Sequence, residues 1–357
     1  MRTTVIIAAV ALQILVLGWM AGQREWIVAT GSRVWLRTAP VDPRDLFRGD
    51  YVILGYEIST IDADKTGPAL RAERDAVNRN DRTERPRYHR EIEVYSQLEL
   101  PQGSDVAQVR QIDLSPPDSG LFIKGRVRPF HIRGQETLSG VSYGIDAFFV
   151  EQGKGRELER NAPQGAPSGV RVPLEMQVAL GRDGTAVLTD YRWNPLGVGL
   201  EIRKDADRSA DHPEQAASSV RLILNYFNAS SKPLAMVLPS DLHTIRLTAL
   251  EFRDGPETDA TPLPTDPPRL RNQDVRILGP GETVSIEIDP QDPRWMPHLP
   301  NKEPQPLWNK DLRARLYRLT YQAPLPEECV GLENAALIWR GRLPSREFGP
   351  YELDRTP

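Results

Sequence analysis

Hydrophobic and polar positions alternate with the two-residue period of a β-strand in many short segments of this chain. Short alternating runs recur, separated by stretches rich in Pro, Gly, Asp and Asn that favour turns. The pattern therefore predicts a mainly β protein. In the first half the expected strands are 33–38, 51–59, 91–100, 121–129, 142–150, 172–180 and 185–193. In the second half they are 220–228, 243–252, 275–278, 283–289, 316–321 and 336–340.

Two segments in the first half predict a particular local structure. Asp183 and Gly184 lie between two alternating runs, which is a strong indication of a β-hairpin. The segment 62–90 is highly charged and has few large apolar residues, so we expect an exposed insertion with a short helix near 68–78.

The segment 203–219 has no large apolar side chain and is interpreted as a linker. Beyond it, the short strands of 220–357 predict an immunoglobulin-like β-sandwich. The segments NASSKPL and GPGETVSIEI are expected to pair within it. Of its tryptophans, Trp339 is expected to be buried, and Trp295 and Trp308 more exposed because they lie in Pro-rich loops.

A nearly unbroken apolar run covers residues 5–21 and extends toward Val28. About 17 residues is the lower limit for crossing a bilayer, and Trp19 and Trp26 resemble interfacial anchors. A cleaved signal peptide is the alternative, but Trp19 and Met20 fit poorly beside a cleavage site. We therefore interpret residues 1–29 as an uncleaved transmembrane signal anchor. Basic residues flank both ends, so orientation rests on the signal-anchor interpretation, which places the soluble part in the periplasm.

Composition adds mainly exclusions. The 49 acidic and 45 basic residues nearly balance, which does not suggest a nucleic-acid-binding protein. A single cysteine, Cys329, excludes an internal disulfide and a cysteine-based zinc site. The five histidines show no helical metal-site spacing, so neither a metal nor another cofactor is expected.

The segment GDYVILGYEIS, residues 49–59, combines a Gly-Asp turn with a strand-like run. It resembles the signature of the GDYXXLXY family, a group of bacterial membrane-anchored proteins. The matching positions are Gly49, Asp50, Tyr51, Leu54, Tyr56 and Ser59. The likeness covers about residues 1–195 and includes the blocks 120–127 and 143–159. It implies a β-rich GDYXXLXY domain over 30–202 and supplies no biochemical activity.

The motif has a structural and a functional interpretation. The Asp50 carboxylate can accept backbone N–H groups and fix the turn, which needs no substrate. Arg44, Asp45 and Arg48 could form a small charged cluster with Asp50, and the functional alternative is that Asp50 contacts a ligand or partner. Asp42, between Pro40 and Pro43, is a further candidate beside Arg44 and Arg48. On an unbulged strand, Tyr51 and Tyr56 would point to opposite faces.

An enzymatic interpretation depends on Lys124. Gly49-Asp50 followed by a strand with a lysine weakly resembles signal-peptidase-type hydrolases, in which a buried neutral lysine activates a serine. Here the ten residues before Gly49 contain no Ser, Thr or Cys. The preferred hypothesis is therefore a non-enzymatic interaction or assembly module, with the lipid bilayer and a membrane or periplasmic protein as partners and no nucleic acid. The serine/lysine hydrolase remains the alternative.

Overall fold

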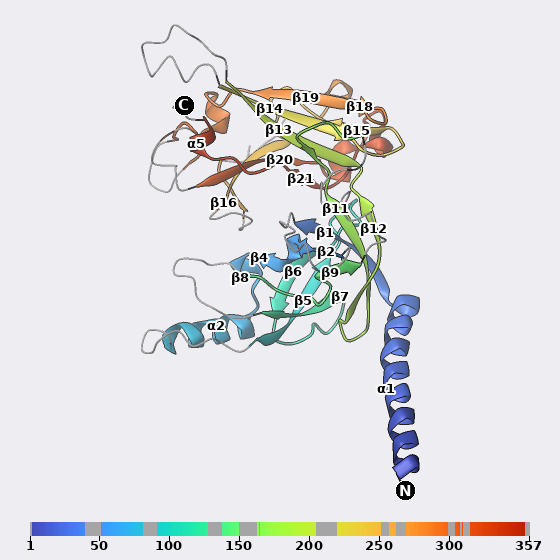
Figure 1. Ribbon diagram of the computed structural model, residues 1–357. Coiled ribbons are helices and arrows are strands. Elements are labelled where there is room, and N and C mark those ends of the chain that lie inside the picture. Colours follow the sequence, from blue (N-terminus) through green and yellow to red (C-terminus); the bar gives the residue numbers. More distant parts are fainter. Residues whose placement is uncertain are drawn as a thin grey trace.

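The computed structural model shows a mainly β protein with one long N-terminal helix (Figure 1). It describes residues 2–39, 51–80, 91–127, 138–149, 163, 165–204, 220–250, 257–261, 269–298, 304–307, 309 and 315–353. The strands form two β units stacked one above the other, each with its own core (Figure 1).

Helix α1, Arg2–Thr30, is long and apolar enough to span a membrane. It projects away from both β units, so the large apolar side chains described between residues 5 and 20 are exposed. Only Gly31 separates α1 from strand β1, Ser32–Ala39. A side chain is excluded at Gly31 because an added Cβ would lie 2.8 Å from the carbonyl oxygen of Leu180. The helix is therefore joined to the first unit without a flexible linker.

The N-terminal unit is built from two larger antiparallel sheets and two short strand pairs. One sheet has the order β12, β11, β1, β3, and the other has the order β6, β5, β7. The remaining pairs are β2 with β9 and β4 with β8. Bounds not yet given are β2 Tyr51–Ile53, β3 Gly55–Tyr56, β4 Thr60–Ile61, β5 Ile92–Glu99, β6 Gln108–Asp113, β7 Leu121–Val127, β8 Leu138–Ser139, β9 Ala147–Phe149, β11 Leu174–Leu180 and β12 Ala186–Trp193.

The predicted hairpin and helix are both present. Gly184 has a φ of +82°, and its N–H donates to Gly181 O at 3.0 Å in the turn between β11 and β12. Helix α2 covers Pro68–Asn80. The segment 62–90 is not wholly exposed, because Leu70 belongs to the core and its N–H donates to Asp113 Oδ1 at 2.9 Å.

The C-terminal unit consists of two four-stranded antiparallel sheets and one strand pair. The sheet orders are β10, β13, β14, β19 and β17, β16, β20, β21, and β15 pairs with β18. A short helix, α5 Pro350–Leu353, ends the described chain. The bounds are β10 Val170–Arg171, β13 Leu196–Lys204, β14 Val220–Asn228, β15 Leu234–Val237, β16 Ile245–Leu250, β17 Glu257–Asp259, β18 Val275–Leu278, β19 Thr283–Ile288, β20 Leu316–Gln322 and β21 Arg342–Pro344.

Both four-stranded sheets contribute to a single core. One sheet supplies buried side chains such as Val198 and Leu224, and the other supplies Leu247 and Leu319. Asn228 links the two segments that were expected to pair: its Nδ2 donates to Gly279 O at 3.1 Å, and its backbone N–H donates to Glu282 O at 2.9 Å. The specific immunoglobulin-like topology is not confirmed.

The boundary between the units differs from the predicted one. Strand β13 pairs along its whole length with β14, so a division at 202–203 would cut through a strand of the C-terminal unit. Strand β10 also pairs with β13 rather than with the N-terminal unit. The chain passes into the C-terminal unit after Trp193, while most of the predicted linker, 205–219, lies outside the described residues.

Four other expectations need correction. The predicted strand 51–59 is divided into β2, β3, a 3₁₀ turn at Glu57–Ser59 and the start of β4. Of the described residues 142–149, only Ala147–Phe149 form a strand, and 336–340 contains part of a 3₁₀ turn, Ala335–Leu337, instead of a strand. Trp295 is buried like Trp339, because it packs into the shared core of the C-terminal unit. Trp308 lies outside the described residues.

Candidate functional site

The described part of the GDYVILGYEIS motif begins at Tyr51. Gly49 and Asp50, together with Asp42, Arg44 and Arg48, lie outside the described residues, so the predicted turn and charged cluster stay predictions. Strand β2 pairs with β9, and the N–H of Leu54 continues this pairing by donating to Asp146 O at 2.8 Å. After Leu54 the chain moves to another sheet, where Gly55 and Tyr56 pair with the end of β1.

The apolar motif residues are part of the core. Leu54, Tyr56 and Ile58 are buried together in the N-terminal unit. The Tyr56 hydroxyl donates to Ile145 O at 2.9 Å, and burial raises the pKa of this phenol far above its usual value. Ser59 is half-buried, and its carbonyl accepts the N–H of Val141 at 3.1 Å. These four residues therefore stabilise the fold.

Two other sequence blocks carry the family resemblance beside the motif: residues 120–127 are the second block and residues 143–159 the third. Both pack against the motif or against each other. Tyr143, from the third block, donates its hydroxyl proton to Ile58 O at 2.8 Å. Gly125, from the second block, faces the Tyr143 ring so closely that an added Cβ would lie 2.9 Å from Cδ1. Next to it, the N–H and C=O groups of Arg126 and Ser142 exchange hydrogen bonds of 2.8 and 2.9 Å. The blocks thus form one packed unit.

Lys124 lacks the surroundings that the hydrolase hypothesis requires. Its side chain is 35% exposed, and Nζ forms an ion pair with Glu93 Oε2 at 2.7 Å. The hydrogen bond to Glu93 raises the pKa of Lys124, whereas a lysine that acts as a general base needs a lowered pKa. Glu93 also accepts the hydroxyl proton of Tyr95 at 2.5 Å. Lys124 is thus a charged surface residue.

The structure also contains a polar cluster that the sequence interpretation missed. Glu175, on β11, is fully buried and accepts three hydrogen bonds. The donors are Arg192 Nε at 2.8 Å, Asn194 Nδ2 at 2.7 Å and Arg37 Nη2 at 3.3 Å. Because an unpaired buried carboxylate is very unfavourable, these partners are what allow Glu175 to remain in the interior.

This cluster lies where the N-terminal unit meets the C-terminal one. Arg37 Nη1 donates to Arg342 O, on β21, at 2.5 Å. Asn194 accepts the N–H of Leu196, the first residue of β13, at 2.9 Å. Arg192 also pairs with Asp105 and lies over the Trp35 ring, with Cζ 4.1 Å from the ring centroid. The Glu175 cluster therefore connects the two units.

Further charged groups continue from this junction onto the C-terminal unit. Glu257 bridges Arg318, at 2.8 Å, and Arg342, and Arg318 also contacts Glu347 at 2.6 Å. Burial lowers the pKa of Arg342, while the Glu57 and Asp62 carboxylates of the other unit act in the opposite direction. Acidic and basic groups from both units thus lie close together. The only indication of this buried cluster in the sequence was a single glutamate, Glu175, within the largely apolar run LEMQVAL.

No metal centre is apparent in the part of the chain that the structure describes. There, no three His, Cys, Asp or Glu side chains are grouped to hold a metal ion. His243 instead pairs with Asp241, with 2.8 Å between Nδ1 and Oδ1. Cys329 is a buried free thiol beside Arg340 Nη1, at 3.2 Å.

Comparison with known proteins identifies a family. No curated protein and no solved structure matches the chain. The family model described as GDYXXLXY protein matches residues 13–190, about half of the chain, including the motif and the two blocks that pack against it. The chain therefore belongs to the GDYXXLXY protein family.

Proposed function

We propose that this protein is a single-pass protein of the bacterial inner membrane whose β units form a non-enzymatic interaction or assembly module. The observation that carries the proposal is α1: its apolar side chains are exposed, yet the helix continues through Gly31 directly into a packed sheet. Exposed apolar surface on this scale is stable in lipid rather than in water. We assign the bilayer as the environment of residues 5–21.

The proposed orientation places the amino terminus in the cytoplasm and both β units in the periplasm. It follows from the signal-anchor interpretation, in which a short amino terminus with Arg2 stays inside. Protease treatment of spheroplasts tests this side. Degradation of the β units only after the membrane is permeabilised would contradict it.

Support for a non-enzymatic role comes from the motif and from Lys124. The Tyr56 hydroxyl and the Ser59 carbonyl form hydrogen bonds within the fold, and Lys124 is held charged by Glu93. The Glu175 cluster joins the two β units, so a partner would meet a module of fixed geometry. The C-terminal unit is proposed to be a β-sandwich, because its two sheets share one core.

A protein partner is proposed to bind the C-terminal unit around residues 325–337. This segment exposes the apolar side chains of Leu325, Val330 and Leu337, and Val330 is 77% exposed. Exposed apolar residues that gather on one segment are typical of protein–protein contact sites. We expect the partner to be a membrane or periplasmic protein and propose no nucleic acid.

The test is site-specific photocrosslinking in intact cells followed by isolation from detergent-solubilised membranes. A crosslinker at Val330 should give a discrete adduct, and a crosslinker at Leu337 should give one that disappears when Val330→Asp is added. A crosslinker at Glu201, which is exposed on β13, is the matched control. No adduct at either apolar position would contradict the proposed partner site.

The membrane part of the proposal is tested separately. Protein extracted from membranes should retain residues 2–22, and alkaline carbonate should not release it. A mature chain that begins near Gln23 would mean that the segment is a cleaved signal peptide and would overturn the anchor.

A further inference from the structure

The last turn of α1 is packed against the hairpin of β11 and β12. Ile27 and Val28 are half-buried, whereas the neighbouring Trp26 is exposed. A Cβ built on Gly181 would lie 3.2 Å from Cγ1 of Ile27, so helix and hairpin are in close contact. Arg33 Nη2 also donates to Val28 O at 3.5 Å. These contacts fix the direction in which α1 leaves the N-terminal unit.

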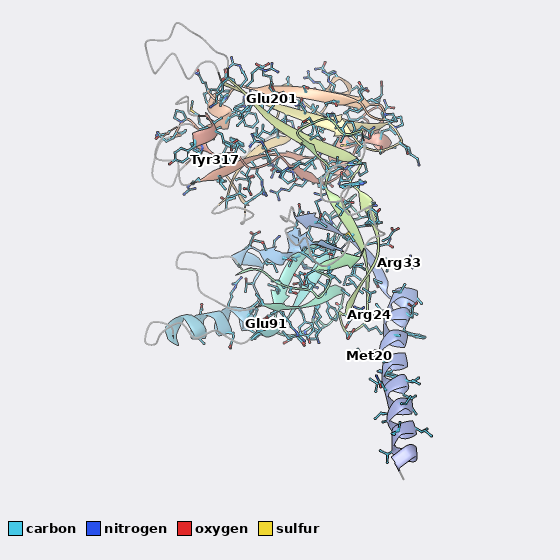
Figure 2. All side chains as sticks on the ribbon, viewed as in Figure 1. Met20, Arg24, Arg33, Glu91, Glu201 and Tyr317 are labelled. Carbon is cyan, nitrogen blue, oxygen red and sulfur yellow. The ribbon has the colours of Figure 1, made fainter. Side chains whose placement is uncertain are left out.

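The same contacts fix how far the hairpin turn lies from the apolar segment. From Ile27 to Ala21 the helix rises about 9 Å, at about 1.5 Å per residue. Residues 5–21 then extend about 26 Å further, close to the thickness of a hydrocarbon core. In Figure 2, Arg24 is drawn level with Glu91 at the lower edge of the N-terminal unit, and Met20 lies below both. The headgroup layer would therefore meet this edge.

The surface beside the turn has a composition that suits this position. Arg182 and Asp183 are exposed at the tip of the turn. Gly184 packs against the Phe122 ring, and its carbonyl accepts the Lys124 N–H at 2.9 Å, which joins the turn to β7. We define the β11–β12 turn, residues 181–185, with Phe122, Lys124, Glu93 and Tyr95 as the turn platform.

Aromatic and charged side chains occur together on the turn platform. The Tyr95 and Phe122 rings are half-buried with their centroids 6.0 Å apart, and the Lys124–Glu93 ion pair is adjacent to them. A Tyr side chain such as Tyr95, which combines an apolar ring with a polar hydroxyl, favours the headgroup level of a bilayer, and Phe122 adds apolar surface beside it. The platform carries both signs of charge, so it complements zwitterionic headgroups, whose phosphate and ammonium groups also have opposite signs.

We propose that the turn platform rests on the zwitterionic phospholipid surface of the membrane that α1 crosses. The N-terminal unit is then held against the bilayer, and the C-terminal unit points away from it (Figure 1). This inference depends on the proposed anchor and adds a second, peripheral lipid contact. In this orientation the 325–337 segment lies at a distance from the membrane surface, where it would meet its partner.

The test uses the full-length protein reconstituted in vesicles of phosphatidylcholine and phosphatidylethanolamine. Arg182→Cys is labelled with an environment-sensitive dye, and a fraction of the lipid carries a headgroup spin label that quenches it. Arg24→Cys is the positive control and Glu201→Cys the negative one. The parent chain, whose single Cys329 is buried, reports background labelling.

We expect the dye at 182 to lose fluorescence to the same extent as the dye at 24, and the dye at 201 to lose none. Flotation of the vesicles separates the two proposals. Protein that floats with the vesicles but is not quenched at 182 would overturn the turn platform while leaving the anchor intact. Protein that does not float would overturn both. Equal quenching at 182 and 201 would also contradict the proposal, because the contact would then not be specific to the platform.

Discussion

At the scale of single residues, Tyr56 allows one buried hydrogen bond to be measured, because its hydroxyl has a buried acceptor, Ile145 O. Tyr56→Phe keeps the ring and removes the donor. We expect a loss of about 1 to 3 kcal/mol in the free energy of unfolding, because a buried carbonyl is left without its partner. Urea unfolding of the full chain in detergent measures it.

Tyr95→Phe is the matched control for Tyr56→Phe. The Tyr95 hydroxyl donates to Glu93 at the surface, where water can replace it, so the change should be within about 0.5 kcal/mol. Equal losses for the two variants would mean that the Tyr56 hydrogen bond does not contribute as described. The sequence also predicts that Asp50→Ala costs roughly 1 to 3 kcal/mol, and this stays a prediction because Asp50 lies outside the described residues.

Glu175 offers a stronger test of a single buried charge. Glu175→Ala removes the acceptor shared by Arg37, Arg192 and Asn194, and we expect a loss of about 3 to 5 kcal/mol because the buried Arg37 guanidinium and the buried Asn194 amide lose their partner. Asp105→Ala removes the other carboxylate on Arg192, but Asp105 is 60% exposed, so about 1 kcal/mol or less is expected. Chemical denaturation of both variants makes the comparison. Similar losses would contradict a special role for burial.

Lys124→Ala addresses the enzymatic alternative. The Lys124–Glu93 pair is a surface ion pair, for which a contribution of about 0 to 1 kcal/mol is typical. We expect a similar melting temperature and unchanged crosslinking at Val330. Loss of a measurable peptide- or ester-hydrolysing activity in Lys124→Ala, with the fold intact, would instead support the hydrolase hypothesis.

At the scale of elements, Gly184 shows how one position determines a hairpin. Its φ of +82° is unfavourable for other residues, and an added Cβ would lie 2.7 Å from the Phe122 ring. Gly184→Ala should therefore destabilise by more than the roughly 1 to 2 kcal/mol of left-handed strain alone. Gly140→Ala isolates that strain, because Gly140 has a φ of +77° and no atom within 4 Å of an added Cβ. Thermal unfolding of the two variants should rank Gly184→Ala as the less stable; the reverse order would contradict the close contact.

Elements with strong local signals could be predicted from the sequence, and those determined by distant contacts could not. The Asp-Gly turn at 183–184, helix α2 and strand β14 all carry their pattern within a few residues. The motif strand 51–59 is largely apolar, but its hydrogen bonds go to two different partners, β9 and β1, which divide it. The prediction for Trp295 was wrong because its Pro-rich surroundings suggest a loop, whereas long-range packing buries it.

The candidate site, too, could be predicted from the sequence only where the signal is local. Tyr56 could be recognised from the sequence as a strand residue, whereas Leu54, predicted in the same strand, lies between β2 and β3 and is buried there. The Glu175 cluster could not, because Glu175 and Arg37 are separated by 138 positions and meet only after β1, β11 and β12 have paired. The hydrogen bond from Arg37 to Arg342, which connects the Glu175 cluster to the C-terminal unit, joins residues 305 positions apart.

At the scale of the whole molecule, two cores are connected through a polar junction. Each β unit buries its own apolar cluster, while the contacts described between the units include the Arg37–Arg342 hydrogen bond and the charges around it. Such a junction contributes orientation more than hydrophobic stabilisation. The C-terminal unit should therefore be able to fold separately if the chain is divided at the correct position.

That position lies before β13, because its residues Leu196, Val198 and Leu200 belong to the C-terminal core and β13 pairs with β14 along its 9 residues. A fragment of residues 194–357 should show a cooperative urea transition with a shift in the fluorescence of the buried Trp295 and Trp339. A fragment of residues 218–357 lacks this strand and exposes the edge of β14, so it should aggregate or unfold without a cooperative transition. If the shorter fragment unfolds as cooperatively as the longer one, β13 is dispensable and the boundary lies in 203–219, as the sequence alone suggests.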